Sequence, residues 1–243
     1  MKIRFTHTIT YLETDTKYKA KFSVLFRYLQ DAAILHSEKA GYRMDSFIQG
    51  GQGWVLNKMD MKVFRYPEYQ ETIEMITWSR SINGVKAKRE FFICNNREKL
   101  IAASSVWVFV DSIRMKIMKT PEEMEARYTV EPETAWNENL EQWRADRILP
   151  ADCGERISTR ISDYDPMGHI NNTVYFDFIE TAISRKIGTP VRISGVKIQF
   201  IHELHPNTFW VNVGLQKADG KYLFTISDDQ HVNAAGELFL EAV

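Results

Sequence analysis

Apolar residues recur at intervals of three and four positions in two segments of the chain. In residues 22–36 this face is formed by Phe22, Leu25, Phe26, Leu29, Ala33 and His36. In residues 175–187 it is formed by Phe178, Ile179, Ala182, Ile183 and Ile187. This spacing is typical of an amphipathic helix. Gly41 follows the first segment, and Gly188 with Pro190 follows the second, so each predicted helix has a stop signal.

The two predicted helices share local sequence and are followed by similar strand-rich regions. Residues 26–32, which begin Phe26-x-x-Leu29, match residues 176–182, which begin Phe176-x-x-Ile179. The two segments are 150 residues apart. Strand-like segments are residues 54–56, 58–64, 72–78, 87–93 and 102–110, then 193–201, 208–215, 222–227 and 237–242. The pattern predicts an α+β fold of two units, each a curved antiparallel sheet wrapped around its helix.

The boundaries follow from a charge-rich segment between the two patterns. We expect an N-terminal domain over residues 1–115, a linker over 116–150 that three prolines interrupt, and a C-terminal domain over 151–243. Tyr128, Trp136 and Trp143 lie inside this linker. Because such aromatics normally pack against other groups, we do not expect the linker to be loose throughout.

Composition narrows the class of protein. The 243 residues carry a formal net charge of −1, which argues against a nucleic-acid binder that works by phosphate neutralisation. Two cysteines, Cys94 and Cys153, are too few for a disulfide framework. The sequence has no apolar segment long enough for a membrane span and no signal-peptide pattern at Met1. We therefore expect a cytoplasmic protein with reduced thiols.

The segment from Asp163 to Tyr175 contains the main group of candidate catalytic residues. It places Asp165, Gly168, His169, Asn171 and Asn172 just before the second helix. An Asn side chain can cap the helix, and the free backbone N–H groups there can stabilise an oxyanion. An ordinary capped turn is the alternative. The corresponding part of the first half lacks the Gly-His and Asn-Asn pairs, which favours chemistry over a requirement of the fold.

A second candidate is His202-Glu203-Leu204-His205, after a predicted strand. The two histidines are three positions apart and not on a helix, so we expect no metal site from this pair. Glu203 is of interest as a second carboxylate that the sheet delivers to the helix N-terminus.

These motifs resemble the acyl-acyl-carrier-protein (acyl-ACP) thioesterases of plants and bacteria, which consist of two hot-dog domains in tandem. The resemblance extends over nearly the whole chain. It rests on Trp54-Val-Leu, Arg65-Tyr-Pro, the Glu71–Trp78 segment, Arg89-x-Phe91, residues 105–111, Asp163-x-Asp165-x-x-x-His169-Ile-Asn-Asn-x-x-Tyr175 and the strand ending at Glu203. It implies hydrolysis of the thioester of fatty acyl-ACP, which ends chain elongation in fatty acid biosynthesis, without a cofactor.

By the same resemblance, Asp165, His169 and Glu203 fall on the family's catalytic acid, histidine and glutamate. Plant members have Asn where Met167 stands and Cys where Leu204 stands, so a thiol nucleophile at that position is excluded. The hypothesis is that Asp165 or Glu203 activates water, or attacks the thioester directly, with an oxyanion hole near Gly168 and His169. We expect Asp165→Ala and His169→Ala to abolish most hydrolysis with little loss of stability.

The implied acyl pocket is expected in the N-terminal domain, between the helix at 22–29 and the strand at 54–61. Trp54, Met59 and Met61 are candidates to set its depth, with plain core packing as the alternative.

The implied partner is an acyl carrier protein with a phosphopantetheine-linked acyl chain. Its acidic surface would dock on basic residues, for which the candidates are Lys86, Lys88, Arg89, Arg97 and Lys99.

Two alternatives stay open. One is a thioesterase that acts on acyl-coenzyme A, and the other is a non-catalytic acyl-binding or interaction protein derived from a thioesterase. No phosphate-cradling loop is visible for coenzyme A. Met167 favours the non-catalytic alternative, whereas Asp165, His169 and Glu203 favour an enzyme. Hot-dog sheets often pair, so the fold is compatible with a homodimer.

Overall fold

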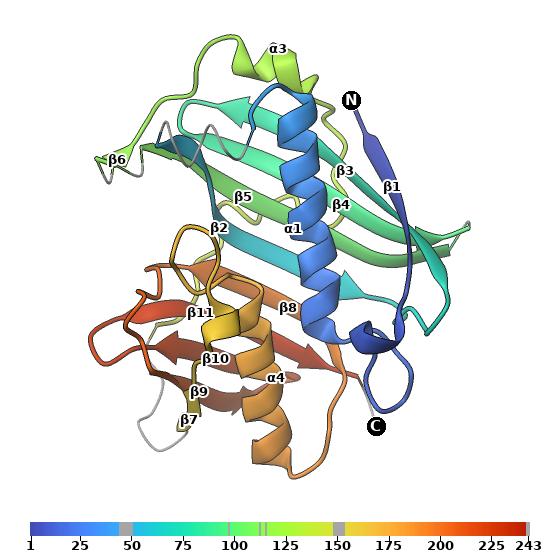
Figure 1. Ribbon diagram of the computed structural model, residues 1–243, viewed down its shortest axis with the longest axis vertical. Coiled ribbons are helices and arrows are strands. Elements are labelled where there is room, and N and C mark those ends of the chain that lie inside the picture. Colours follow the sequence, from blue (N-terminus) through green and yellow to red (C-terminus); the bar gives the residue numbers. More distant parts are fainter. Residues whose placement is uncertain (44–50, 97, 112, 115, 148–153, 242–243) are drawn as a thin grey trace. The chain divides into compact units, whose positions relative to one another are not determined.

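The chain forms two compact units, residues 1–142 and 143–243 (Figure 1). The computed structural model describes residues 1–43, 51–96, 98–111, 113–114, 116–147 and 154–241. Each unit is an antiparallel sheet with one long helix. The predicted α+β architecture is therefore confirmed for both halves of the chain.

In the first unit the strands lie in the order β1-β3-β4-β5-β2, and the short β6 pairs with β5. Their bounds are β1 Ile3–Thr8, β2 Gln52–Val63, β3 Thr72–Asn83, β4 Lys86–Asn95, β5 Glu98–Asp111 and β6 Lys116–Ile117. Helix α1, Phe22–Lys39, contacts β3 across the sheet face (Figure 1), and the short α3 is Met124–Tyr128.

The second unit repeats this topology. Its strands lie in the order β7-β9-β10-β11-β8, with bounds β7 Gly154–Ser158, β8 Ile193–Phe200, β9 Trp210–Ala218, β10 Lys221–Ser227 and β11 Val232–Leu240. Helix α4, Val174–Ile187, contacts β9 and β7. It ends at Gly188, which adopts a left-handed conformation (φ 80°) that a residue with a side chain rarely takes.

The helical periodicity correctly predicts which residues form the core. The whole predicted face of α1, including His36, is buried, and so are Phe178, Ile179, Ala182 and Ile183 of α4. The prediction is wrong for Ile187, which is 39% exposed in the last turn of α4. Burying each large apolar side chain contributes about 1.5–3 kcal/mol, so these two stripes hold each helix on its sheet.

The predicted linker of residues 116–150 contains the boundary between the units, but much of it packs on the first unit. The Nε1 of Trp78 donates to the carbonyl of Glu133 at 2.9 Å, and Trp136 donates to Asp60 at 3.0 Å. Met124 and Tyr128 are buried. Residues 148–153, with Cys153, lie outside the described part of the chain. The first unit thus extends well beyond residue 115.

Strands β1 and β7 were not expected from the sequence. Each lies at the edge of its sheet, where one pairs with β3 and the other with β9. Their segments alternate between exposed and partly covered positions, with Ile3 alone buried, and contain few strongly apolar residues. Hydrophobic periodicity therefore does not reveal them.

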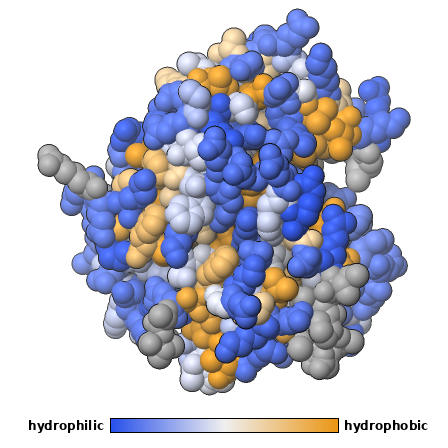
Figure 2. Space-filling model, turned by 180° about the vertical axis from the view of Figure 1, so that it is seen from behind, coloured by the Kyte–Doolittle hydropathy of each residue, from blue (hydrophilic) through white to orange (hydrophobic). Residues whose placement is uncertain are grey.

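The surface seen from behind is largely hydrophilic, with separate hydrophobic patches (Figure 2). The most exposed large apolar side chains are Ile161, Leu12 and Ile113. No helix in the described part of the chain combines the length and the hydrophobicity needed to cross a bilayer.

Candidate active site

A tight turn from Asp165 to His169 precedes α4. The Asp165 carboxylate oxygen Oδ1 accepts the backbone N–H groups of Met167 at 2.9 Å and His169 at 3.2 Å. The turn is closed by the Asp165 N–H, which donates to the carbonyl of His169 at 2.8 Å, and by the Gly168 N–H, which donates to the carbonyl of Asp165 at 2.9 Å. One oxygen of Asp165 therefore organises the backbone that presents His169.

The same turn occurs in the first unit, 150 residues earlier. Oδ1 of Asp15 accepts the N–H groups of Lys17 at 2.8 Å and Lys19 at 3.1 Å, and the Asp15 N–H donates to the carbonyl of Lys19 at 2.8 Å. Tyr18 has a positive φ of 58° where Gly168 has 80°. The turn is therefore a property of the fold, and the side chain of His169, where the first unit has Lys19, is what distinguishes the second unit.

His169 and Glu203 are brought together by the fold. Nδ1 of His169 lies 3.3 Å from Oε2 of Glu203, and both side chains are about one-third exposed. Glu203 lies in the segment that follows β8. This segment is fixed by the buried Asn233, whose side chain donates to the carbonyl of Glu203 at 3.1 Å and to Asp228 at 3.2 Å. An imidazole in contact with a carboxylate at an accessible site is suited to proton transfer.

Leu204 cannot take part in the chemistry. Its side chain is buried, and its carbonyl accepts the N–H of Ile170 at 3.2 Å, which ties the segment after β8 to the turn. Tyr175 is also buried at this point, and burial raises the pKa of its phenol above the usual range. The backbone bond between Ile170 and Leu204 therefore holds the segment of Glu203 next to the turn of His169.

The predicted oxyanion hole differs from the structure. The Gly168 and His169 N–H groups are used inside the turn, and the Asn171 N–H donates to the carbonyl of Asp163 at 2.9 Å. The side-chain oxygen of Asn171 accepts the N–H of Thr173 at 2.9 Å, just before α4 begins at residue 174. Among the described residues, the backbone N–H of Asn172 has no partner and so can donate a hydrogen bond to a ligand oxygen.

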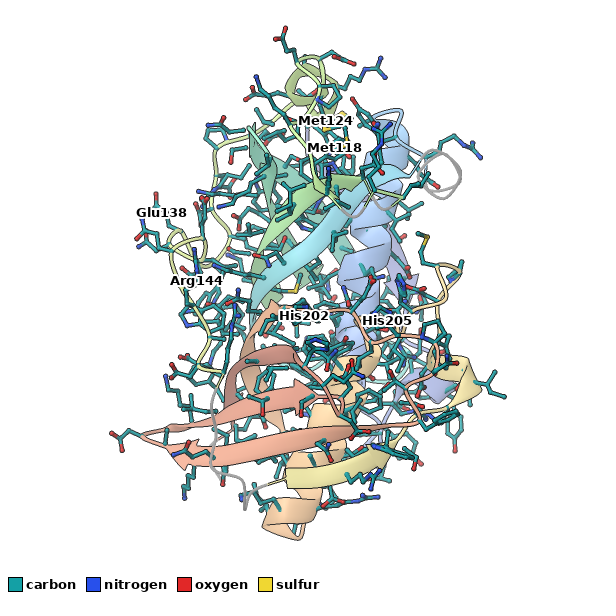
Figure 3. The ribbon with its side chains drawn as sticks, turned by 90° about the vertical axis from the view of Figure 1, so that its left-hand side faces the viewer. Met118, Met124, Glu138, Arg144, His202 and His205 are labelled. Atoms are coloured by element: carbon teal, nitrogen blue, oxygen red, sulfur yellow. The ribbon has the colours of Figure 1, made fainter. Side chains whose placement is uncertain are left out.

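The sequence identifies His205 as part of a candidate segment but assigns it no role in the site. His205 follows β8 in the same segment as His202 (Figure 3). Its ring lies 6.2 Å from that of His169, centroid to centroid, whereas the ring of His202 lies 5.0 Å from that of His231. The two neighbouring histidines therefore belong to different clusters. Their spacing of three does not reveal this, because each pairs with a residue far away in the sequence.

The first unit holds a cavity of about 300 Å³. It is lined mainly by apolar and aromatic groups from α1, β2, β3, β4 and β5, among them Ala33, Ile34, Trp54, Ile82, Trp107 and Phe109. Trp54 lies in this lining. Met59 and Met61 do not, and both are buried, so the core-packing alternative applies to them. Helix α1 contributes Ala33, Ile34 and Ser37, and no residue of the predicted 22–29 segment.

Arg89 is buried and lines this cavity, so its predicted part in a docking surface is wrong. Its Nη1 lies 2.7 Å from Nδ1 of His36. Burial, together with the charge of Arg89, lowers the pKa of His36 to about 3, so the imidazole is neutral and accepts this hydrogen bond.

The other predicted docking residues are also engaged. Lys86 and Lys88 pair with Glu141 at 2.9 and 2.8 Å, and Lys99 lies over the ring of Phe92 at 3.9 Å. Arg97 lies outside the described residues. These contacts do not support the predicted docking face.

The two units have the architecture of tandem hot-dog domains. The solved acyl-ACP thioesterase of Bacteroides thetaiotaomicron has a TM-score of 0.84 and 16% identity, covering 99% of this chain and 98% of that one. The 12:0-ACP thioesterase of Umbellularia californica gives the same TM-score and identity, with 99% and 97% covered. At this identity the similarity establishes the fold.

Sequence comparison establishes the family. Residues 2–128 match the model of the acyl-ACP thioesterase N-terminal domain, and residues 150–235 match that of the C-terminal domain. The chain therefore belongs to the acyl-ACP thioesterase family. It is 31% identical over 175 residues to the chloroplastic acyl-ACP hydrolase FATB2 of Cuphea viscosissima, covering 66% of this chain and 42% of that protein.

A second relative is the chloroplastic palmitoyl-acyl carrier protein thioesterase of Cuphea hookeriana. It is 27% identical over 172 residues, which cover 66% of this chain and 41% of that protein. This chain thus spans less than half the length of these two curated relatives.

Proposed function

We propose that this protein hydrolyses the thioester of fatty acyl-ACP and releases a free fatty acid. The observation that carries the proposal is the contact between His169 and Glu203 at 3.3 Å, in a chain of the acyl-ACP thioesterase family. The names of the curated relatives, palmitoyl-ACP thioesterase and acyl-ACP hydrolase, support the substrate class.

In the proposed reaction, water attacks the thioester carbonyl carbon while Glu203 accepts one of its protons, with His169 orienting the carboxylate. The carbonyl oxygen becomes an oxyanion, which the N–H of Asn172 stabilises. The tetrahedral intermediate then collapses, the carbon–sulfur bond breaks, and the proton held by Glu203 passes to the departing thiolate. The products are a fatty acid and the free thiol of the carrier.

Asp165 acts as a positioning residue in this proposal. Its Oδ1 accepts two backbone N–H groups, as does that of Asp15 in the turn that carries no histidine. This oxygen is therefore committed to the backbone of the turn, as it is in the first unit. The comparison between the two turns therefore favours Glu203 as the base.

The cavity of the first unit is the proposed site for the acyl chain. Its volume of about 300 Å³ lies at the lower end of the range for ligand pockets, about 300–1,000 Å³. Its aromatic lining suits an apolar chain, and Trp54 is proposed to limit the length accepted.

The test is thiol release by the purified chain from acyl-ACP and acyl-coenzyme A carrying the same acyl group. We expect faster release from the carrier protein, and loss of release in the Glu203→Gln variant. Faster hydrolysis of the coenzyme A ester supports the alternative substrate class. Binding of acyl-ACP without any thiol release, in the wild type, identifies a non-catalytic acyl-binding protein and overturns the proposal.

The cytoplasmic location and the homodimer stay predictions. The two Cuphea relatives are chloroplastic proteins, so the location is tested by fractionation of the source cells. Sedimentation of the purified chain tests the dimer.

A further inference from the structure

Three side chains of the second unit converge at one point, and two of them are the His169–Glu203 pair to which the hydrolysis is assigned. One ligating atom from each of His169, Glu203 and His205 lies within 4.8 Å of the others. Among the residues that the structure describes, this is the one such group of three or more histidine, cysteine or acidic side chains. It combines two imidazoles with one carboxylate, which is a common ligand set of zinc sites with an open position.

The distances fit a small tetrahedral ion. Zinc–nitrogen and zinc–oxygen bonds of about 2.0–2.1 Å place neighbouring ligand atoms about 3.4 Å apart around a tetrahedron. The separation between Nδ1 of His169 and Oε2 of Glu203 is 3.3 Å, so these two atoms already have that spacing. The remaining atom approaches by rotation of the exposed His205 side chain.

His205 is available as the third ligand. Among the described residues its ring has no hydrogen-bond partner, and its ring contact is with His169. His202, three positions earlier, faces His231 instead. The exposure of His169, Glu203 and His205 leaves the fourth position of a bound ion open to water.

We propose that His169, Glu203 and His205 bind Zn²⁺ and that the bound ion inhibits hydrolysis. A zinc ion on these atoms takes the lone pairs that His169 and Glu203 need for proton transfer. The inhibition rests on the function proposed above, but the binding itself does not. Zinc would thus act here as a reversible inhibitor that competes with the chemistry for the same two side chains.

Binding is tested with Co²⁺ as a spectroscopic probe of the full chain, followed by displacement with Zn²⁺. We expect the visible absorption of tetrahedral Co²⁺ to appear with one equivalent and to disappear when Zn²⁺ is added. His205→Ala removes one of three protein ligands, so the dissociation constant for Zn²⁺ should rise by about tenfold or more. His202→Ala is the matched control, and it should bind as the wild type does.

Inhibition is scored as the ratio of hydrolysis rates with and without Zn²⁺ in each variant. We expect this ratio to be close to one in His205→Ala and low in the wild type and in His202→Ala. Equal Zn²⁺ affinity of the wild type and His205→Ala overturns the proposal. A loss of Zn²⁺ affinity in His202→Ala as large as that in His205→Ala overturns it as well. Circular dichroism verifies folding, and His205→Asn replaces the alanine variant if that one is unfolded. If the chain hydrolyses no thioester, the proposed function is wrong, but the Co²⁺ titration still tests whether His169, Glu203 and His205 bind a metal ion.

Discussion

His169 and Glu203 meet although they come from different elements, the turn before α4 and the segment after β8. Nδ1 of the first lies 3.3 Å from Oε2 of the second. The hydrogen bond from the Ile170 N–H to the carbonyl of Leu204 joins the two segments one residue beyond each partner. This backbone hydrogen bond holds the two segments together, so His169 and Glu203 meet only in the folded domain.

Replacing either member of this pair should abolish most of the hydrolysis. We expect His169→Ala and Glu203→Gln each to lower kcat by about 10²–10⁴ fold, because each removes a group that moves or positions a proton. The double variant should be little worse than either single one, since the two residues act as a unit. Steady-state thiol release measures all three variants.

Lys19→Ala is the matched control, because Lys19 occupies the position of His169 in the first-unit turn. It should hydrolyse acyl-ACP at the wild-type rate. Full activity of His169→Ala would falsify the assignment of the pair.

The two aspartates of the duplicated turns should contribute similarly to stability. Asp15→Ala and Asp165→Ala each leave two backbone N–H groups without their acceptor, so each should lower the free energy of unfolding by about 1–3 kcal/mol. This revises the expectation from sequence that Asp165→Ala leaves stability nearly intact. Urea denaturation monitored by circular dichroism measures both variants.

Asp165→Asn separates positioning from acid–base chemistry. An asparagine keeps the oxygen that accepts the backbone N–H groups, so this variant should retain the turn and most of the activity. A loss of hydrolysis as large as that of Glu203→Gln, in a variant of normal stability, would assign the base to Asp165 instead.

Trp54 should control the length of acyl chain, whereas Met59 should control only stability. Trp54 lines the cavity, so Trp54→Ala enlarges it and should shift the released fatty acids towards longer chains. Met59 is 1% exposed and lies outside this lining, so Met59→Ala should cost about 2–5 kcal/mol of stability without changing the products. Gas chromatography of the fatty acids gives the comparison. A change of product chain length in Met59→Ala, with none in Trp54→Ala, would show that Met59 and not Trp54 lines the acyl pocket.

Glu90 should make the first unit less stable as the pH rises. It is 1% exposed, and burial raises the pKa of its carboxyl to about 7. The folded state therefore holds a proton that the unfolded chain releases near pH 4.3. Its stabilising contribution is complete below that pH and is lost as the pH rises through 7.

Between pH 5 and 8 this effect amounts to about 2–3 kcal/mol of unfolding free energy. The Glu90→Gln variant should lack this part of the pH dependence, because an amide does not titrate. Urea denaturation of both proteins at the two pH values measures the difference. Identical pH dependence in the two proteins would show that Glu90 is ionised in the fold throughout this range.

The sequence predicts the repeated architecture well because its evidence is local. The apolar spacing along α1 and α4 identifies both helices and their buried faces, and the offset of 150 residues identifies the duplication. The edge strands β1 and β7 escape prediction because pairing with a neighbouring strand, and not an apolar pattern, holds them in the sheet.

The site is predicted less completely. Asp165, His169 and Glu203 stand out through their motifs, but the hydrogen bonds that occupy the N–H groups of Gly168 and His169 depend on the exact turn. Arg89 looks like a surface cation in a strand, yet its side chain points to the interior and bonds His36. His205 gains its neighbour only when the chain folds. Such contacts are decided by tertiary structure, which spacing along the chain does not encode.

The duplicated turn also bears on how this protein arose. Two domains with one strand order and one hydrogen-bonding scheme for the turn are the expected result of a duplication within the chain. Since the loop keeps its shape with either lysine or histidine at the shared position, the histidine can be lost there without loss of the turn. Evolution could therefore divide labour between the copies without rebuilding either one.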